Sequence, residues 1–149
     1  MNPARRLSVV AARCIGCRAC ATVCPAGLIV LTEADRRRTV RFAATCSEEC
    51  DRCAAACPTG AIGLNGTGTG TETVLEFTLV ACAQCGAPLA PAEMLAHLRA
   101  TIPDRMQTDA QGQEWLTLCP TCRQRLEARR LGAGVAHLAA PARQVAFPS

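Results

Sequence analysis

Two cysteine-rich segments that repeat one another constrain this chain more than any other feature. Residues 14–31, CIGCRACATVCPAGLIVL, and residues 46–64, CSEECDRCAAACPTGAIGL, superpose with an offset of 33 residues that takes Cys17 onto Cys50. The same offset aligns the other shared positions: Cys20 with Cys53, Cys24 with Cys57, Pro25 with Pro58, Gly27 with Gly60, Ile29 with Ile62 and Leu31 with Leu64. A repeated unit of this length usually stacks on its copy around one shared core.

The first run, Cys14-x2-Cys17-x2-Cys20-x3-Cys24-Pro25, has the ligand spacing of bacterial ferredoxins that hold two 4Fe-4S clusters. Three thiolates on one tight loop reach three irons of one cube, and the fourth, carried away by the x3 step and the proline, reaches the other cluster. A pair of zinc sites is disfavoured, because zinc sites rarely use this spacing. The prediction is a crossed set of ligands, with Cys14, Cys17, Cys20 and Cys57 on one cluster and Cys46, Cys50, Cys53 and Cys24 on the other.

The second run departs from the pattern at its first cysteine. Cys46 precedes Cys50 by three intervening residues instead of two, so the loop must bulge. Two outcomes follow from this spacing. Either Cys46 still reaches its iron, or that centre is a three-iron cluster or one with a labile iron.

The last four cysteines form two further knuckles, Cys82-x2-Cys85 and Cys119-x2-Cys122. Each knuckle points two sulfurs to one side, and two of them complete a tetrahedral site that suits Zn²⁺ or a single Fe. A third 4Fe-4S cluster is the remaining alternative, although a cube usually needs a longer enclosing loop. We therefore expect two 4Fe-4S clusters and one Zn²⁺.

Composition limits the cellular setting and the role. All twelve cysteines fall in C-x2-C or C-x3-C steps, which is how one metal centre is supplied with ligands, so a reducing, cytoplasmic setting is expected. The net charge of +4 counts thiols as neutral; with metals bound it falls to roughly −2, which argues against nucleic acid as a partner. No apolar run is long enough to span a membrane. With three Phe, one Trp and no Tyr, the metals must supply much of the folding free energy.

The pattern along the chain predicts an α+β protein in three parts. Residues 1–78 form a pseudo-twofold, two-cluster ferredoxin-like domain, 79–131 a small rubredoxin-like or zinc-ribbon module, and 132–149 an extended tail. Strands are expected at 28–32 and 39–43 around a charged turn at 33–38, with Arg36, Arg37 and Arg38 either solvated or a docking patch. A flexible loop is expected at 65–72. Helices are expected from Pro91 to before Pro103, and from 120 to an end at Gly132.

The order of these motifs resembles a known family. A two-cluster ferredoxin unit followed by CAQCGAPLAPAE (residues 82–93) and CPTCR (residues 119–123) is similar to the small iron-sulfur subunits of formate hydrogenlyase and related membrane-bound hydrogenases. Those subunits are in turn similar to the eight-iron subunit of respiratory complex I. The resemblance covers roughly residues 12–130. It implies a cytoplasmic subunit that meets the inner face of the membrane only through its catalytic and redox partner subunits.

The expected function is a one-electron relay inside a multisubunit oxidoreductase of the hydrogenase or formate dehydrogenase type. No catalytic residue is predicted, since the two histidines lie far apart and no phosphate-binding loop is present. Two alternatives stay open. One is a freely diffusing low-potential ferredoxin; the other is a zinc-ribbon adaptor or nucleic-acid-binding protein that uses RQRLEARR (residues 123–130) as its contact face.

Overall fold

The computed structural model describes residues 4–46, 49–109 and 112–138. Its N-terminal part contains five strands, one 3-10 helix and two short α-helices before the long strand β6. They are β1 (Arg5–Val9), the 3-10 helix η1 (Ala11–Arg13), α1 (Ala19–Val23), β2 (Ile29–Ala34), β3 (Arg37–Phe42), β4 (Thr45–Cys46), α2 (Arg52–Ala56) and β5 (Ile62–Thr67). The rest of the described chain contains β6 (Thr73–Ala81), β7 (Pro88–Pro91), α3 (Ala92–Thr101), the 3-10 helices η2 (Asp104–Met106) and η3 (Trp115–Thr117), and α4 (Pro120–Leu138).

The sequence repeat is also a structural repeat. The helices α1 and α2 begin at Ala19 and Arg52, and the strands β2 and β5 begin at Ile29 and Ile62, so each pair keeps the sequence offset. Gly27 and Gly60 precede these strands with φ of 63° and 62°, a left-handed conformation that glycine adopts without steric cost. The mixture of helix and sheet agrees with the predicted class.

One buried core joins the two halves of the repeat. Its buried members come from both repeats and from β1, β3 and β6: Leu7, Cys20, Ile29, Val40, Phe42, Cys53, Ile62 and Phe77. The equivalent residues Ile29 and Ile62 both lie in this core, as do Cys20 and Cys53. The two halves therefore fold as one unit, because neither can bury its apolar face alone.

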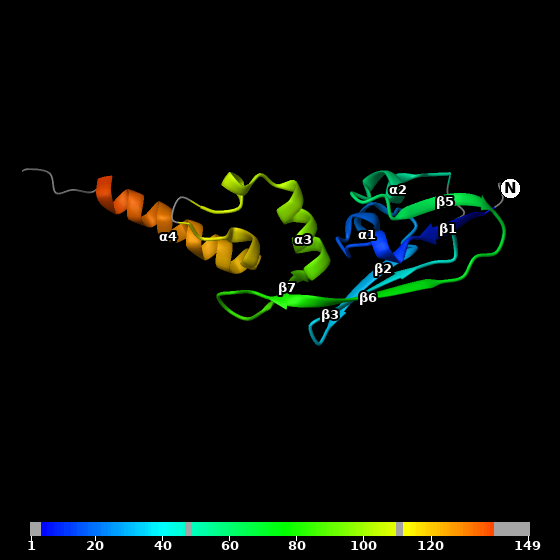
Figure 1. The fold of residues 1–149 in the computed structure, drawn as a ribbon, viewed down its shortest axis with the longest axis horizontal. Helices are drawn as coiled ribbons and strands as arrows, with labels where there is room; N and C mark the ends of the chain where they lie inside the picture. The colour runs from blue at the N-terminus through cyan, green and yellow to red at the C-terminus, as the bar shows by residue number, and fades with distance from the viewer. Residues whose placement is uncertain (1–3, 47–48, 110–111, 139–149) are drawn as a thin grey trace, which may run out of the picture.

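Two antiparallel sheets carry these elements, with strand orders β4-β1-β5 and β2-β3-β6-β7. β6 pairs with β3 along its first part and with β7 at its end, where Leu79 lies opposite Pro91. The boundary expected between residues 78 and 79 thus falls inside a continuous strand. Figure 1 shows β6 and β7 leading from the cysteine repeats toward α3 and α4.

The β2–β3 hairpin is tighter than its sequence indicates. Ala34 pairs with Arg37, and only Asp35 and Arg36 form the turn, with φ of 50° and 60°. A two-residue turn with both residues left-handed matches the right-handed twist of the strands. The predicted charged turn at 33–38 was therefore wrong at its ends, which are paired strand residues.

The last helix is longer than predicted. α4 continues through Gly132 and Gly134 to Leu138, so the predicted end at Gly132 was wrong. Neither glycine's added Cβ would meet any neighbouring atom, and neither adopts the positive φ of a helix-ending glycine. The remainder of the predicted tail, residues 139–149, lies outside the described residues.

Candidate metal centres

Eight cysteines line two separate cavities in the N-terminal unit. The cysteines that line the first cavity are Cys14, Cys17, Cys20 and Cys57. Those that line the second are Cys24, Cys46, Cys50 and Cys53. In each cavity the fourth cysteine comes from the other repeat, because the short helix and the Cys-Pro step carry it across. The structure thus brings together the two sets that the spacing pointed to; their binding of iron stays a prediction.

The surroundings of these thiols fit a cationic core. Burial raises the pKa of Cys14 and of Cys53, and it raises the pKa of Cys20 to about 11. Neighbouring cysteines in the same cavity add to each rise, since a second thiolate nearby disfavours the first. Four such sulfurs become thiolates together only when a metal core supplies compensating positive charge.

Backbone amides donate to the cysteine that crosses between repeats in each case. The amide of Leu28 lies 3.4 Å from Cys24 Sγ, and the amide of Ala61 lies 3.2 Å from Cys57 Sγ. At Cys57, burial opposes ionisation, but hydrogen bonds from Thr59 and Ala61 outweigh it and lower the thiol pKa. Such bonds to sulfur favour the more negative, reduced state of a cluster.

Cys46 joins its cavity despite the extra residue in its run. It is buried in β4 and pairs with Arg5 of β1, which fixes its backbone independently of the loop that follows. The Arg5 guanidinium also donates to the carbonyl of Cys50, so one side chain ties β1 to the ligand loop. Residues 47 and 48, which carry the added length, lie outside the described part of the chain.

Arg38 holds the loop that carries Cys14 and Cys17 at the first cavity. Its guanidinium donates to the carbonyl of Gly16, between Cys14 and Cys17, at 2.5 Å, and it pairs with Glu33 at 2.7 Å. Burial of Glu33 would raise its pKa, but hydrogen bonds from Arg18 and Arg38 outweigh this and lower it. The expectation that Arg38 belongs to a solvated turn or a docking patch was wrong, because the residue is only 3% exposed.

Sequence reasoning missed Arg38, although a usable signal was present. Residues 38, 40 and 42 are buried and alternate with less buried positions along β3, and Val40 and Phe42 are core residues. Because side chains alternate across a strand, Arg38 shares their inward face. The run of three arginines concealed this periodicity.

The last four cysteines form a much tighter group. The Sγ atoms of Cys82, Cys85, Cys119 and Cys122 all lie within 4.8 Å of one another, and those of Cys85 and Cys119 are 3.7 Å apart. A Zn–S bond of about 2.3 Å in a tetrahedron separates the sulfurs by about 3.8 Å. Among the described residues, the eight N-terminal cysteines form no group this close. This difference in sulfur separation is expected, because four thiolates around one ion lie closer together than four thiolates around a 4Fe-4S cube.

Backbone hydrogen bonds make this four-cysteine site suitable for a cation. The amide of Cys119 donates to Cys82 Sγ at 3.3 Å, and this bond contributes most to lowering the pKa of Cys82 to about 6. Burial, followed by hydrogen bonds that the Cys122 thiol donates to the other three cysteines, raises the pKa of Cys122 to about 12. The turn after Cys82 closes through the amide of Gly86, whose φ of 74° suits glycine.

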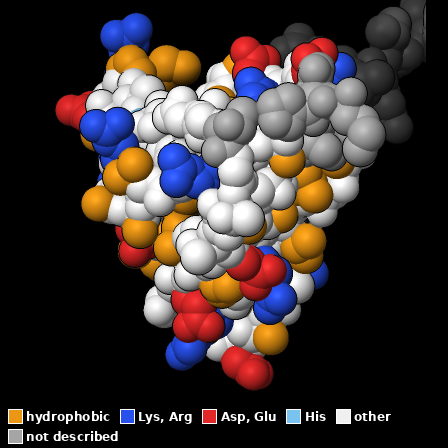
Figure 2. All heavy atoms as spheres, turned by 90° about the vertical axis from the view of Figure 1, so that its right-hand side faces the viewer, with side chains coloured by type: hydrophobic (Ala, Val, Ile, Leu, Met, Phe, Trp, Pro, Cys, Tyr) orange, Lys and Arg blue, Asp and Glu red, His pale blue; other side chains and the backbone are white. Residues whose placement is uncertain are grey.

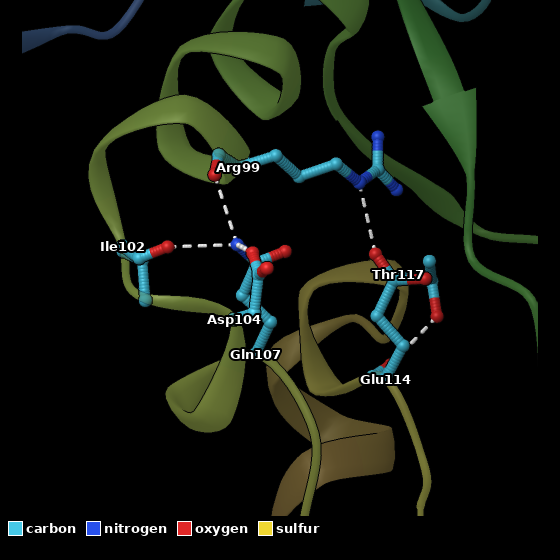
Figure 3. A network of polar contacts seen from close by, with 6 residues as sticks. All are labelled: Arg99, Ile102, Asp104, Gln107, Glu114 and Thr117. Atoms are coloured by element: carbon cyan, nitrogen blue, oxygen red, sulfur yellow. Dashed lines mark hydrogen bonds and ion pairs between the residues drawn. The ribbon is translucent and has the colours of Figure 1, made fainter.

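A polar network holds the segment that leads into the second knuckle (Figure 3). The Gln107 amide donates to the carbonyls of Arg99 and Ile102 and to Asp104 Oδ1. Glu114 Oε1 accepts from Arg99 Nε at 2.9 Å, and its carbonyl accepts from Thr117 Oγ1 at 2.8 Å. The carbonyl of Thr117 in turn accepts from the Ala83 amide, which ties the two knuckles together.

Residues 123–130, the basic face that a nucleic-acid partner would contact, make several contacts within the protein instead. Arg123 donates to the carbonyls of Trp115 and Leu118, and its guanidinium lies 5.1 Å from the centroid of the Trp115 ring. Arg130 pairs with Glu127 on the same helix. Figure 2 views the opposite end of the molecule, away from α4, and on that face basic and acidic side chains are interspersed with apolar ones.

Comparison with known protein families bears on the two N-terminal cavities. Residues 13–61 match the model of the 4Fe-4S dicluster domain, a span that contains all eight cysteines of the two cavities. No curated protein matches the chain. The match supports an iron-sulfur protein with an electron-transfer role. Over the part of the chain that the structure describes, no helix combines the length and the apolar character that crossing a membrane requires.

Proposed function

We propose that this chain relays single electrons through two 4Fe-4S clusters, one held by each four-cysteine cavity. The observation that carries the proposal is the crossed grouping of the cysteines, in which each cavity takes three ligands from one repeat and the fourth from the other. When bound, the clusters supply reversible one-electron chemistry. The chain's own residues hold them close together, because α1 and α2 pack side by side and link the two cavities.

The four-cysteine module is proposed to hold one Zn²⁺, with a single Fe as the alternative. The sulfur distances favour one ion over a third cube, as argued from the tetrahedral spacing. Three of the four sulfurs belong to buried residues of a small core that also contains Leu118. Zinc has no redox chemistry, so this site would be structural and would stand outside the electron path.

Metal and sulfide analysis of anaerobically isolated protein tests both assignments. We expect about eight Fe, eight sulfide and one Zn per chain. About twelve Fe and twelve sulfide without Zn would contradict the single-ion module. Cys46→Ser should lower the iron content to about seven or fewer. A wild-type content already near seven, unchanged in this variant, would show that Cys46 is no ligand.

The finer proposal is that the relay is a subunit of a hydrogenase- or formate dehydrogenase-type complex, with a neighbouring molybdenum or tungsten oxidoreductase as a variant of this idea. It rests on the resemblance of residues 82–93 and 119–123 to such subunits. Co-purification with a large catalytic subunit supports this proposal, whereas isolation as a single chain that reduces diffusible acceptors supports the free ferredoxin.

A further inference from the structure

The ligand loop of the first cavity packs against residues that lie outside the cysteine repeats. Gly16, between Cys14 and Cys17, is buried and has φ of +63°. A Cβ added there would lie 2.9 Å from Phe77 Cδ2 and 3.1 Å from Pro91 Cγ. The Gly16 backbone therefore packs against Phe77 and Pro91 with no space for a side chain, and a shift of the loop toward β6 or β7 would meet these two residues.

The position of Pro91 depends on the turn that carries the first knuckle. The amide of Cys82 donates to the carbonyl of Ala87 at 2.7 Å, closing the turn from which β7 begins. β7 then places Pro91 opposite Leu79 of β6, and Pro91 is fully buried. In the same strand, Leu89 packs against the core formed by Cys82, Cys119 and Cys122. An ion that fixes these cysteines therefore fixes β7.

The β2–β3 hairpin makes a second link between the two metal loops. The Arg36 guanidinium donates to the carbonyl of Gly86 in the knuckle turn at 2.8 Å. Two residues further on, Arg38 donates to the carbonyl of Gly16 at 2.5 Å. The carbonyl of Arg36 accepts from the Leu79 amide at 2.8 Å, which holds the hairpin against β6. One rigid hairpin thus contacts a loop of each site.

We propose that the four-cysteine module is a brace for the first cluster only, with Pro91 as its main positioning residue. The ion fixes the turn at residues 82–87 and β7, and Pro91 then holds the Gly16 loop where Cys14 and Cys17 converge with their partners. The second cavity is lined by residues from Leu7 to Cys53, none of which belongs to the module. Loosening the module should therefore release the first cluster and leave the second bound. This inference rests on the proposed function, since it requires both clusters.

Two prolines of the same strand provide a matched test. Pro91 is fully buried against Gly16, whereas Pro88 is exposed at the start of β7. In full-length, anaerobically loaded protein, Pro91→Ala should accelerate iron loss to a chelator about tenfold, because truncating a buried side chain favours local opening. Pro88→Ala should lose iron at the wild-type rate. The cysteine β-proton resonances shifted by the clusters identify which centre is lost, and those of Cys14 and Cys17 should disappear first.

A second variant tests the brace by weakening the ion's binding site. Cys85 is the one exposed cysteine of the module, so Cys85→Ser weakens the ion's site with least disturbance of its core. It should also release the first cluster faster than the second. Equal rates for the Pro91 and Pro88 variants, or simultaneous loss of both clusters, would overturn the brace while leaving the relay intact. Wild-type protein without iron would overturn the relay itself, and with it the brace.

Discussion

At the scale of single residues, the most unusual feature is a buried guanidinium beside the first cavity. The side chain of Arg38 is 4% exposed, and it pairs with Glu33, whose side chain is 35% exposed and also accepts from Arg18. A buried charge persists only when it is paired and hydrogen-bonded. Two arginines on one glutamate leave a net positive charge next to the loop between Cys14 and Cys17.

Replacing this arginine should change the redox behaviour of one centre. Arg38→Met keeps most of the side-chain volume but removes the charge, so we expect the reduction potential of the first cluster to fall and that of the second to stay. The loss of the hydrogen bonds should also lower the free energy of unfolding by about 1–3 kcal/mol. A redox titration followed by electron paramagnetic resonance measures the potentials, and denaturant unfolding measures the stability.

Arg37→Met is the matched control for this change. Arg37 lies on the same strand, but its ion pair with Glu76 is exposed to solvent on both sides. Exposed pairs contribute little, so stability should change by less than about 1 kcal/mol and neither potential should move. Equal potentials in wild-type and Arg38→Met protein would show that Arg38 has only a structural role.

The unequal thiols of the four-cysteine site predict how its proton release depends on pH. Metal ligands must be deprotonated. With a pKa of about 6, Cys82 is a thiol below that pH and releases a proton on binding, whereas above it the residue is already a thiolate. Cys122, with a pKa of about 12, releases its proton throughout this range.

We therefore expect the number of protons released per Zn²⁺ to fall by about one as pH rises from about 5 to about 7. Calorimetric titration of the zinc-depleted, cluster-loaded protein in buffers of different ionisation enthalpy measures that number. Proton release that stays constant across pH 6 would contradict the role assigned to the Cys119 amide.

At the scale of elements, sequence patterns located most helices and strands but misplaced their ends. A helix from Pro91 to before Pro103 was expected because apolar residues recur there at helical spacing, but α3 spans Ala92–Thr101 and Pro91 is the last residue of β7. The β2–β3 turn was expected to be longer because its charged residues look solvated. Pairing of Glu33 with Arg38 across the strands overrides that signal, since hydrogen bonds between strands are not visible in local composition.

The two glycines in α4 give a test of its observed length. Neither Gly132 nor Gly134 has an atom near an added Cβ, so alanine fits at both positions. Gly132→Ala should stabilise the end of α4 by about 1 kcal/mol, because glycine is a poor helix former. Slower amide exchange of residues 128–134 would show the effect. Gly27→Ala also has open space, but φ of +63° makes it strained, and it should lower stability.

At the scale of the whole molecule, the proposed metal ligands are part of the hydrophobic cores. Cys20 and Cys53 are buried in the same core as Phe42 and Phe77, and the module's core contains three of its own four cysteines. Removing the metals would break the metal–sulfur bonds and leave buried thiols without a bonding partner. The free energy of metal binding is then largely the free energy of folding.

Removal of iron and zinc should therefore unfold the chain. We expect the metal-free protein to lose its dispersed amide spectrum and its cooperative thermal transition, and reconstitution with iron, sulfide and zinc to restore both. Restoring zinc alone should order the module's knuckles but not the two repeats. A metal-free chain that still unfolds cooperatively would show that apolar burial suffices.

The sequence by itself determined which cysteines belong together. Ligand spacing is a local property, so the runs beginning at Cys14 and Cys46 and the knuckles at Cys82 and Cys119 pointed to three groups of cysteines without a fold. Only the tertiary structure decided how those sites are supported. The contacts of Arg38 and Pro91 with Gly16 join segments more than twenty residues apart, and no local pattern encodes such packing. Whether a charged side chain is solvated or buried depends on which segments pack over it. For Arg38, the packing of the β2–β3 hairpin, β6 and β7 decides this.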